Sequence, residues 1–179
     1  YESYIIRKEA YGNMHDDTAQ SLNNLALLYQ QKKEYEKSEK MFLESYDILC
    51  GFLGGNHPRI AALLNNLSTL NKIMGDLDEA LQYALKAYDI LKNHYAEDHP
   101  QIMMTHYGLA ILYAERNEYE KAIQYLLPVY YDSHKKAGPD DKYTYHYFNY
   151  LHMYYTEEMS TEAYNGGLDN GYAELNFNT

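Results

Sequence analysis

Residues 15–50, HDDTAQSLNNLALLYQQKKEYEKSEKMFLESYDILC, have the pattern of one helical hairpin, and this pattern recurs twice downstream. His15, His57 and His99 head the three copies at a constant spacing of 42 residues. The same spacing aligns three leucines (Leu25, Leu67, Leu109) and three tyrosines (Tyr46, Tyr88, Tyr130). A fixed period of this length is typical of a solenoid, in which each unit buries its apolar face against its neighbours. The sequence therefore predicts an all-α fold, an α-solenoid of antiparallel helix pairs.

Within the first copy, apolar residues at three- and four-residue spacing predict helices at about 16–31 and 34–51. We expect three full repeats, at 15–56, 57–98 and 99–140. Proline follows the second and third histidines, as Pro58 and Pro100, where the first turn of a helix tolerates it. Gly75 is placed to end a helix in the left-handed conformation. Pro128 falls inside a predicted helix and predicts a kink, because it removes a backbone hydrogen bond.

The pattern weakens at both ends of the predicted solenoid, which spans 1–164. Residues 1–12 fit the second helix of a truncated repeat, so we expect a fragment of a longer protein. Residues 141–164 form a degenerate capping repeat, since terminal repeats are usually atypical. Four tyrosines there share one helical stripe, which we expect to pack on the preceding helix (Tyr143, Tyr147, Tyr150, Tyr154). Residues 165–179 carry no helical period and predict a non-repeat tail.

The composition excludes several classes of protein. A net charge of −11 argues against a nucleic-acid binder, which needs clustered lysine and arginine. No apolar run is long enough to cross a membrane, and the N-terminal residues lack the apolar segment of a signal peptide. The single cysteine, Cys50, cannot form an internal disulfide, which fits a reducing compartment. We expect a cytoplasmic protein, with the cytoskeleton or a cilium as candidate places of association.

The residues Leu22, Leu25, Ala26, Tyr29, Ser38, Phe42 and Ser45 resemble the signature of the tetratricopeptide repeat (TPR). The usual unit has about 34 residues, and the 42-residue spacing resembles instead the repeat of the kinesin light chains. The resemblance implies a right-handed superhelix with the first helix of each unit lining a concave face. It also implies that this face binds short extended peptides, whose backbones are held by asparagines and whose acidic side chains meet basic residues.

The asparagine pairs suit such a role on chemical grounds as well. Asn23-Asn24 and Asn65-Asn66 recur at the 42-residue period, so they fall in register on successive first helices. An asparagine amide has both a donor and an acceptor and can satisfy a peptide backbone. Alternatively, one asparagine of each pair bonds across to the adjacent helix and fixes the helix spacing; the two roles are compatible. Beside the pairs, we predict that six residues project into the groove: Leu27, Gln30, Thr69, Lys72, Ile111 and Ala114.

The asparagine column changes in the third unit and returns in part as Asn149. Tyr107 and Gly108 stand in place of the pair, which leaves either a wide pocket for a bulky ligand side chain beside Tyr107 or simple drift. Among the groove positions only Lys72 is basic, whereas Glu115 and Glu157 are acidic. We therefore expect a neutral, aromatic or mildly basic peptide rather than the acidic peptides of the kinesin light chains.

The remaining polar residues predict no catalytic chemistry. The three recurrent histidines stand at helix starts, where capping explains them, and they are too far apart to ligate one metal ion. We predict no enzyme activity, metal or cofactor, and interpret the chain as a scaffold or adaptor that binds a partner protein.

One alternative is a structural subunit of a larger cytoskeletal or ciliary assembly with no exchangeable peptide ligand. A further hypothesis concerns self-association, through the C-terminal tail or the open N-terminal helix. In its sharpest form, residues 168–177 occupy the groove of their own or a neighbouring molecule.

Overall fold

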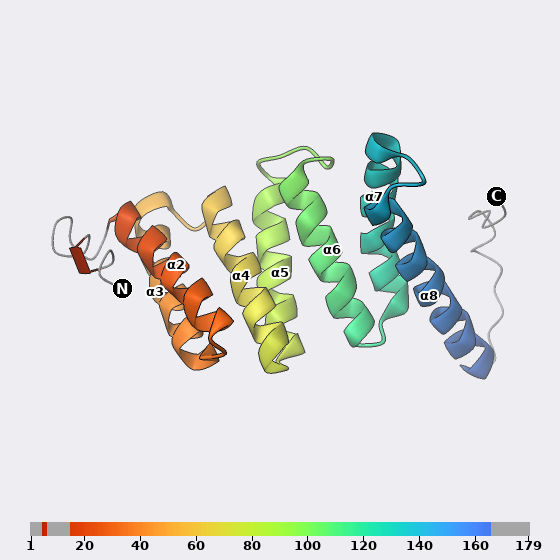
Figure 1. Ribbon diagram of the computed structural model, residues 1–179, viewed down its shortest axis with the longest axis horizontal. Helices are drawn as coiled ribbons and strands as arrows, with labels where there is room; N and C mark the ends of the chain where they lie inside the picture. The colour runs from red at the N-terminus through yellow and green to blue at the C-terminus, as the bar shows by residue number, and fades with distance from the viewer. Residues whose placement is uncertain (1–4, 7–14, 166–179) are drawn as a thin grey trace.

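The computed structural model describes residues 5–6 and 15–165 of the 179-residue chain, and the backbone alone for 161–165. Successive helices run antiparallel and stack side by side along one axis (Figure 1). The helices are α2 (Asp16–Gln31), α3 (Tyr35–Leu53), α4 (Pro58–Met74), α5 (Leu77–Lys92), α6 (Pro100–Glu115), α7 (Tyr119–Ala137) and α8 (Lys142–Asn165). The predicted all-α solenoid of antiparallel helix pairs is confirmed.

The recurrent histidines begin the first helix of each pair. The Nδ1 atom of His15 accepts a hydrogen bond from the backbone N–H of Asp17 at 3.1 Å, and His57 and His99 repeat this cap at 3.2 Å. Pro58 and Pro100 follow as the first helical residues, where the absent N–H has no intrahelical partner to lose. The capping interpretation of the three histidines is therefore confirmed.

The turn inside each pair needs a residue with positive φ. Gly75 ends α4 with φ of 91°, as its position predicts. The equivalent residues 42 positions before and after are Lys33 and Asn117, each with φ of 60°. The same left-handed turn thus recurs in these three hairpins, with residue types that favour positive φ at Gly75 and Asn117 but not at Lys33.

Each pair closes over small side chains. Ser38 and Ser45 of α3 are fully buried, and their hydroxyls donate to the backbone oxygens of Ala26 and Ala19 at 2.8 Å. Phe42 lies between them on the same face, also fully buried. Alanine and valine take the serine positions in the later repeats, so the same close crossing is made there by apolar contact.

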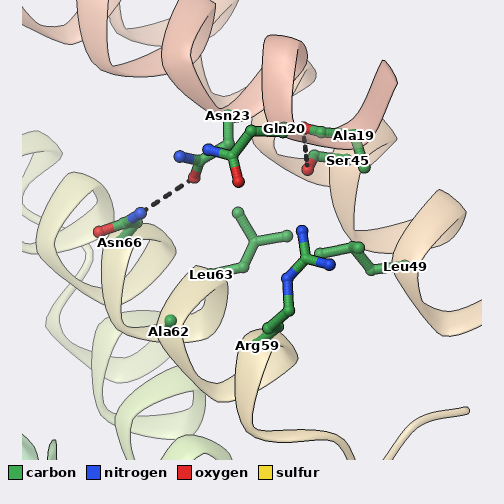
Figure 2. Close-up of a pocket in the computed structure, with 9 residues that line it drawn as sticks. All are labelled: Ala19, Gln20, Asn23, Ser45, Leu49, Arg59, Ala62, Leu63 and Asn66. Atoms are coloured by element: carbon green, nitrogen blue, oxygen red, sulfur yellow. Dashed lines mark hydrogen bonds between the residues drawn. The ribbon is translucent and has the colours of Figure 1, made fainter. Parts of the chain in front are cut away.

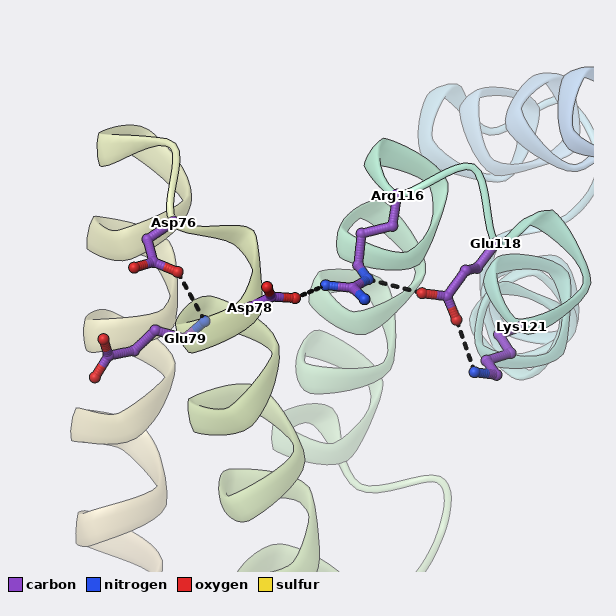
Figure 3. Close-up of polar contacts among 6 residues, drawn as sticks. All are labelled: Asp76, Asp78, Glu79, Arg116, Glu118 and Lys121. Atoms are coloured by element: carbon purple, nitrogen blue, oxygen red, sulfur yellow. Dashed lines mark hydrogen bonds and ion pairs between the residues drawn. The ribbon is translucent and has the colours of Figure 1, made fainter.

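An ionic chain joins the second and third pairs on one edge (Figure 3). Arg116, at the end of α6, forms ion pairs with Asp78 of α5 and with Glu118 before α7. Glu118 also pairs with Lys121 at 2.7 Å. These ion pairs add a surface contact between the turns of neighbouring repeats.

Pro128 does not end its helix. α7 runs from Tyr119 to Ala137 with the proline inside it, and buried Leu126 and Val129 hold the helix on either side. Burial of these side chains offsets the backbone hydrogen bond that proline removes. The predicted kink at this residue stays a prediction.

α8 packs on α7 and continues to Asn165, beyond the point where the earlier first helices turn. Its tyrosine stripe is unevenly covered: Tyr154 is buried, Tyr147 and Tyr150 are half-buried and Tyr143 is exposed.

Of the expected N-terminal helix at 1–12, the structure describes only residues 5 and 6, which are helical. The tail at 166–179, including its proposed groove segment 168–177, lies outside the described residues. In the described part of the chain, no helix has both the length and the apolarity needed to cross a membrane.

Candidate functional site

The first helices of the pairs, α2, α4, α6 and α8, are neighbours, and we call their shared surface the A-helix face. Asn66 of α4 donates from Nδ2 to Oδ1 of Asn23 on α2 at 3.1 Å. Asn65 donates in the opposite direction along the stack, to Oγ1 of Thr105 on α6 at 2.9 Å. The asparagines therefore do bond across adjacent helices, as one of the two interpretations of the pairs required.

The Asn23–Asn66 bond uses one end of each amide. No hydrogen bond to another described residue engages the Nδ2 group of Asn23 or the Oδ1 atom of Asn66. Figure 2 shows these two ends on the same side of the bond, pointing away from the cleft beside it. The pair thus presents one donor and one acceptor at the surface between α2 and α4.

A cleft of about 260 Å³ lies next to this pair, between α2, α3 and α4 (Figure 2). Its floor is apolar, with Leu49 and Leu63, and its rim is polar, with Gln20 and Arg59. Nη1 of Arg59 lies 2.5 Å from Oδ1 of Asp16, so the cation of the rim is compensated by a neighbouring carboxylate. We call this the first cleft.

Gln20 and Arg59 line the first cleft but are not among the groove residues predicted from the sequence. Helical spacing could have found Arg59, because Arg59, Leu63 and Asn66 follow one another at intervals of four and three residues on one face of α4.

The other predicted residues of α2 and α4 lie along the same helices but are less central. Asn24 is exposed and accepts a hydrogen bond from Gln20 at 3.2 Å, and Leu27 is also exposed. Gln30 is half-buried. Thr69 is exposed and donates to the backbone oxygen of Asn65 at 2.9 Å, within its own helix. None of these four lines the first cleft.

A second cleft, of about 370 Å³, lies between α4, α6 and α8. The predicted groove residues Lys72, Ile111 and Ala114 line it, together with Glu115 and four residues from α7 and α8: Tyr119, Tyr150, Met153 and Tyr154. Nζ of Lys72 lies 3.1 Å from Oε1 of Glu115, so the one predicted basic group is neutralised within the protein.

Burial raises the pKa of Tyr154 well above its ordinary value, with smaller contributions from neighbouring side chains, first among them Tyr150. The tyrosine therefore stays neutral, and the second cleft offers mainly apolar and aromatic surface.

Tyr107 and Asn149 lie apart from both clefts. The Tyr107 ring packs edge-on against Tyr147 with centroids 5.3 Å apart, and its hydroxyl lies 3.4 Å from Nε2 of His146. Burial raises the pKa of Tyr107. Asn149 is exposed on α8. The predicted residues thus form no single site but are spread along the A-helix face.

Gly108, which follows Tyr107, is open: a Cβ atom added there would meet no other atom within 4 Å.

Among the described residues, no three histidine, cysteine, aspartate or glutamate side chains are grouped so that they could hold a metal ion. The polar atoms of the A-helix face are arranged for hydrogen bonding along a surface.

Comparison with known proteins gives this repeat a family. The sequence profile described as "Tetratricopeptide repeat" matches residues 1–51, 17–93 and 59–127. The chain belongs to the tetratricopeptide repeat family. TPR units build scaffolds for protein–protein interaction, and the chain is such a scaffold.

Solved structures with this TPR fold include kinesin light chain-like proteins. Two crystal structures of kinesin light chain nearly identical TPR-like repeats from Podosopora anserina have TM-scores of 0.74 at 16% and 17% identity. The alignments cover 91% of this chain and 77% of those chains. The structure of BtubC (BKLC) from P. vanneervenii has a TM-score of 0.62 at 20% identity, with 93% and 55% covered. No curated protein matches the sequence.

Proposed function

We propose that this TPR solenoid is an adaptor whose A-helix face binds an extended segment of a partner protein. The observation that carries the proposal is the donor and the acceptor that half-buried Asn23 and Asn66 leave unpaired beside the first cleft. A cytoplasmic, cytoskeleton-associated location belongs to the same proposal.

The chemistry of an extended peptide supports this use of the asparagines. Such a peptide has backbone N–H and C=O groups that need partners once a protein covers them. The free Nδ2 group of Asn23 can donate to a peptide carbonyl, and the free Oδ1 atom of Asn66 can accept from a peptide N–H. Because the two amides also bond to each other, their orientations are fixed before the peptide arrives, which reduces the entropic cost of binding.

The charges on this face favour a neutral or mildly basic segment. Arg59 is paired with Asp16 and Lys72 with Glu115, so neither cation is uncompensated. An acidic side chain of the partner would have to compete with a carboxylate that is already in place. The second cleft, with Ile111 and Tyr154, suits an apolar side chain of the same segment.

The test is selection of binding peptides from a displayed random library, followed by affinity measurement with the Asn23→Ala/Asn66→Ala double variant. We expect the double variant to weaken binding by about tenfold or more, since one or two hydrogen bonds to the peptide are lost. Gln124→Ala is the matched control, because it removes an exposed amide from α7. Circular dichroism must show that both variants keep their helices. Equal affinity of the double variant and the wild type would refute the role of the pair.

The rival function is a structural subunit with no exchangeable ligand. It is favoured by the large side chains that α8 exposes, Tyr145 and Met159, with 63% and 60% of their surfaces accessible. Stable co-purification of a large partner that no peptide displaces, together with loss of that partner in a Tyr145→Ser variant, would support this rival.

A further inference from the structure

A third cleft, of about 540 Å³, opens where α6, α7 and α8 meet. α6 contributes Met103, Met104 and Tyr107, and α8 contributes the rings of Tyr143 and Tyr147. The side chains of the cleft walls differ in exposure. Met103 is packed in the core, whereas Met104 and Tyr143 are 70% and 61% exposed and can adjust to a ligand.

This third cleft is the equivalent of the first cleft, two repeats later. Gln20, Asn23 and Arg59 line the first cleft, and the residues 84 positions further on, Met104, Tyr107 and Tyr143, line the third. Three polar side chains have thus been replaced by a thioether and two aromatic rings at the same places in the fold. The two clefts therefore offer different chemistry on the same A-helix face.

The polar groups around the third cleft are already used inside the protein. Asp132 pairs with Lys136 at 2.8 Å, and the hydroxyls of Ser133 and Thr144 lie 2.7 Å apart. Oδ2 of Asp141 caps α8 by accepting from the backbone N–H groups of Tyr143 and Thr144 at 2.9 and 3.1 Å. A ligand here meets mainly apolar and aromatic atoms, so the side chains that fit are large and uncharged.

We propose that the third cleft binds an apolar anchor, one or two large aliphatic or aromatic side chains, on the partner segment whose backbone Asn23 and Asn66 hold, and that basic residues flank this anchor. The inference rests on the proposed function and extends it from backbone binding to sequence specificity. The basic flanks follow from charge complementarity, because within three residues of the cleft lining the sequence has more acidic than basic side chains. These are Glu97, Asp98, Asp132, Asp140 and Asp141 against Lys135, Lys136 and Lys142. Such a surface attracts a basic segment and repels an acidic one.

The experiment uses the full chain and peptides selected from a displayed random library. Met104→Glu and Tyr143→Ser change exposed walls of the third cleft, so neither disturbs the core. Met159→Glu is the matched control, because Met159 is an exposed methionine of α8 outside the cleft. Methyl resonances of labelled methionines report directly where the peptide lies, with Met103 and Met104 in the cleft and Met159 outside it.

We expect the selected peptides to combine an apolar anchor with basic neighbours. Their affinity should fall about tenfold with Met104→Glu and with Tyr143→Ser, and not with Met159→Glu. The peptides should shift the resonances of Met103 and Met104 and bind more weakly as salt is raised. Peptides that bind through Asn23 and Asn66 but are indifferent to Met104→Glu and leave Met104 unshifted would overturn this inference while the adaptor function stood. Failure to select any peptide would overturn both.

Discussion

Replacement of His106 by leucine should stabilise the protein, because this histidine is buried where other repeats have an apolar residue. The equivalent residues 42 and 84 positions earlier are Leu64 and Leu22, both buried. His106 is 8% exposed and its ring lies 5.0 Å from that of Tyr88 and 5.5 Å from that of Tyr125. Among the described residues, neither ring nitrogen has a hydrogen-bond partner.

The magnitude follows from two opposing terms. A buried polar group without a partner costs about 1–3 kcal/mol, and leucine removes this cost. Leucine also forfeits the contacts with the two tyrosine rings, each worth roughly 0.5–1.5 kcal/mol. Leucine fits this position in two other repeats, so little strain is added. These two terms roughly cancel, and the net gain comes from burial of a leucine side chain, which is more apolar than the imidazole ring. We therefore expect the His106→Leu variant to be more stable than the wild type by about 1 kcal/mol at neutral pH.

The advantage of the leucine should grow in acid. Burial lowers the pKa of His106 below 6.5, and the opposing charge of Glu97 is the smaller effect. The unfolded histidine therefore binds its proton at a higher pH than the folded one does. Protonation of His106 therefore costs the wild type no stability above about pH 6.5, but its free energy of unfolding falls as the pH drops below this value. The leucine variant lacks this group and has no such loss.

Urea unfolding followed by circular dichroism, from about pH 8 to about pH 5, measures both effects. His134→Leu, at an exposed position of α7, is the control for loss of a histidine outside the core. The reasoning is refuted if His106→Leu is no more stable than the wild type near pH 8, or if the difference does not widen toward pH 5.

Three further predictions concern the repeat framework. Gly108→Ala should raise the free energy of unfolding by about 0.5–1 kcal/mol, because an added Cβ meets no atom in this mid-helical position. Gly75→Ala, with φ of 91°, should instead lower it by about 1–2 kcal/mol, and the same urea assay would contradict the reasoning if both glycine changes had the same sign. Arg116→Gln should lower the melting temperature at low salt only, since the ion pairs with Asp78 and Glu118 are screened at high salt; a difference that persisted in high salt would argue against the ionic chain.

The helices could be predicted closely from the sequence because their signals are local. The predicted spans 16–31 and 34–51 correspond to Asp16–Gln31 and Tyr35–Leu53. The histidine caps and the prolines after them act within one turn of the chain, so the period alone located them. The turn at Lys33 shows the limit of local signals, because lysine, unlike Gly75 and Asn117, is not a residue type that favours positive φ.

The contacts of the A-helix face were less predictable because they depend on the exact register and angle between the first helices of neighbouring repeats. The 42-residue period makes Asn23 and Asn65 equivalent, yet Asn23 accepts from Asn66 while Asn65 donates to Thr105. Lys72 is neutralised by a residue 43 positions away. Side-chain pairing across helices changes with shifts of an ångström or two, and a period fixes only the order of the helices.

The junctions between the described helix pairs share one apolar core but differ in the surface contacts that cross them, and this affects their sensitivity to salt. Ion pairs cross the first two junctions, as Arg59–Asp16 and Lys72–Glu115, and the second also has the ring contact of Tyr88 with His106. The junction with α8 is crossed by rings and hydroxyls, as Tyr107–Tyr147 and Ser133–Thr144. Salt weakens the ion pairs and spares the contacts of rings and hydroxyls. Raising the ionic strength should therefore loosen the surface contacts at the first two of these junctions more than those at the junction with α8.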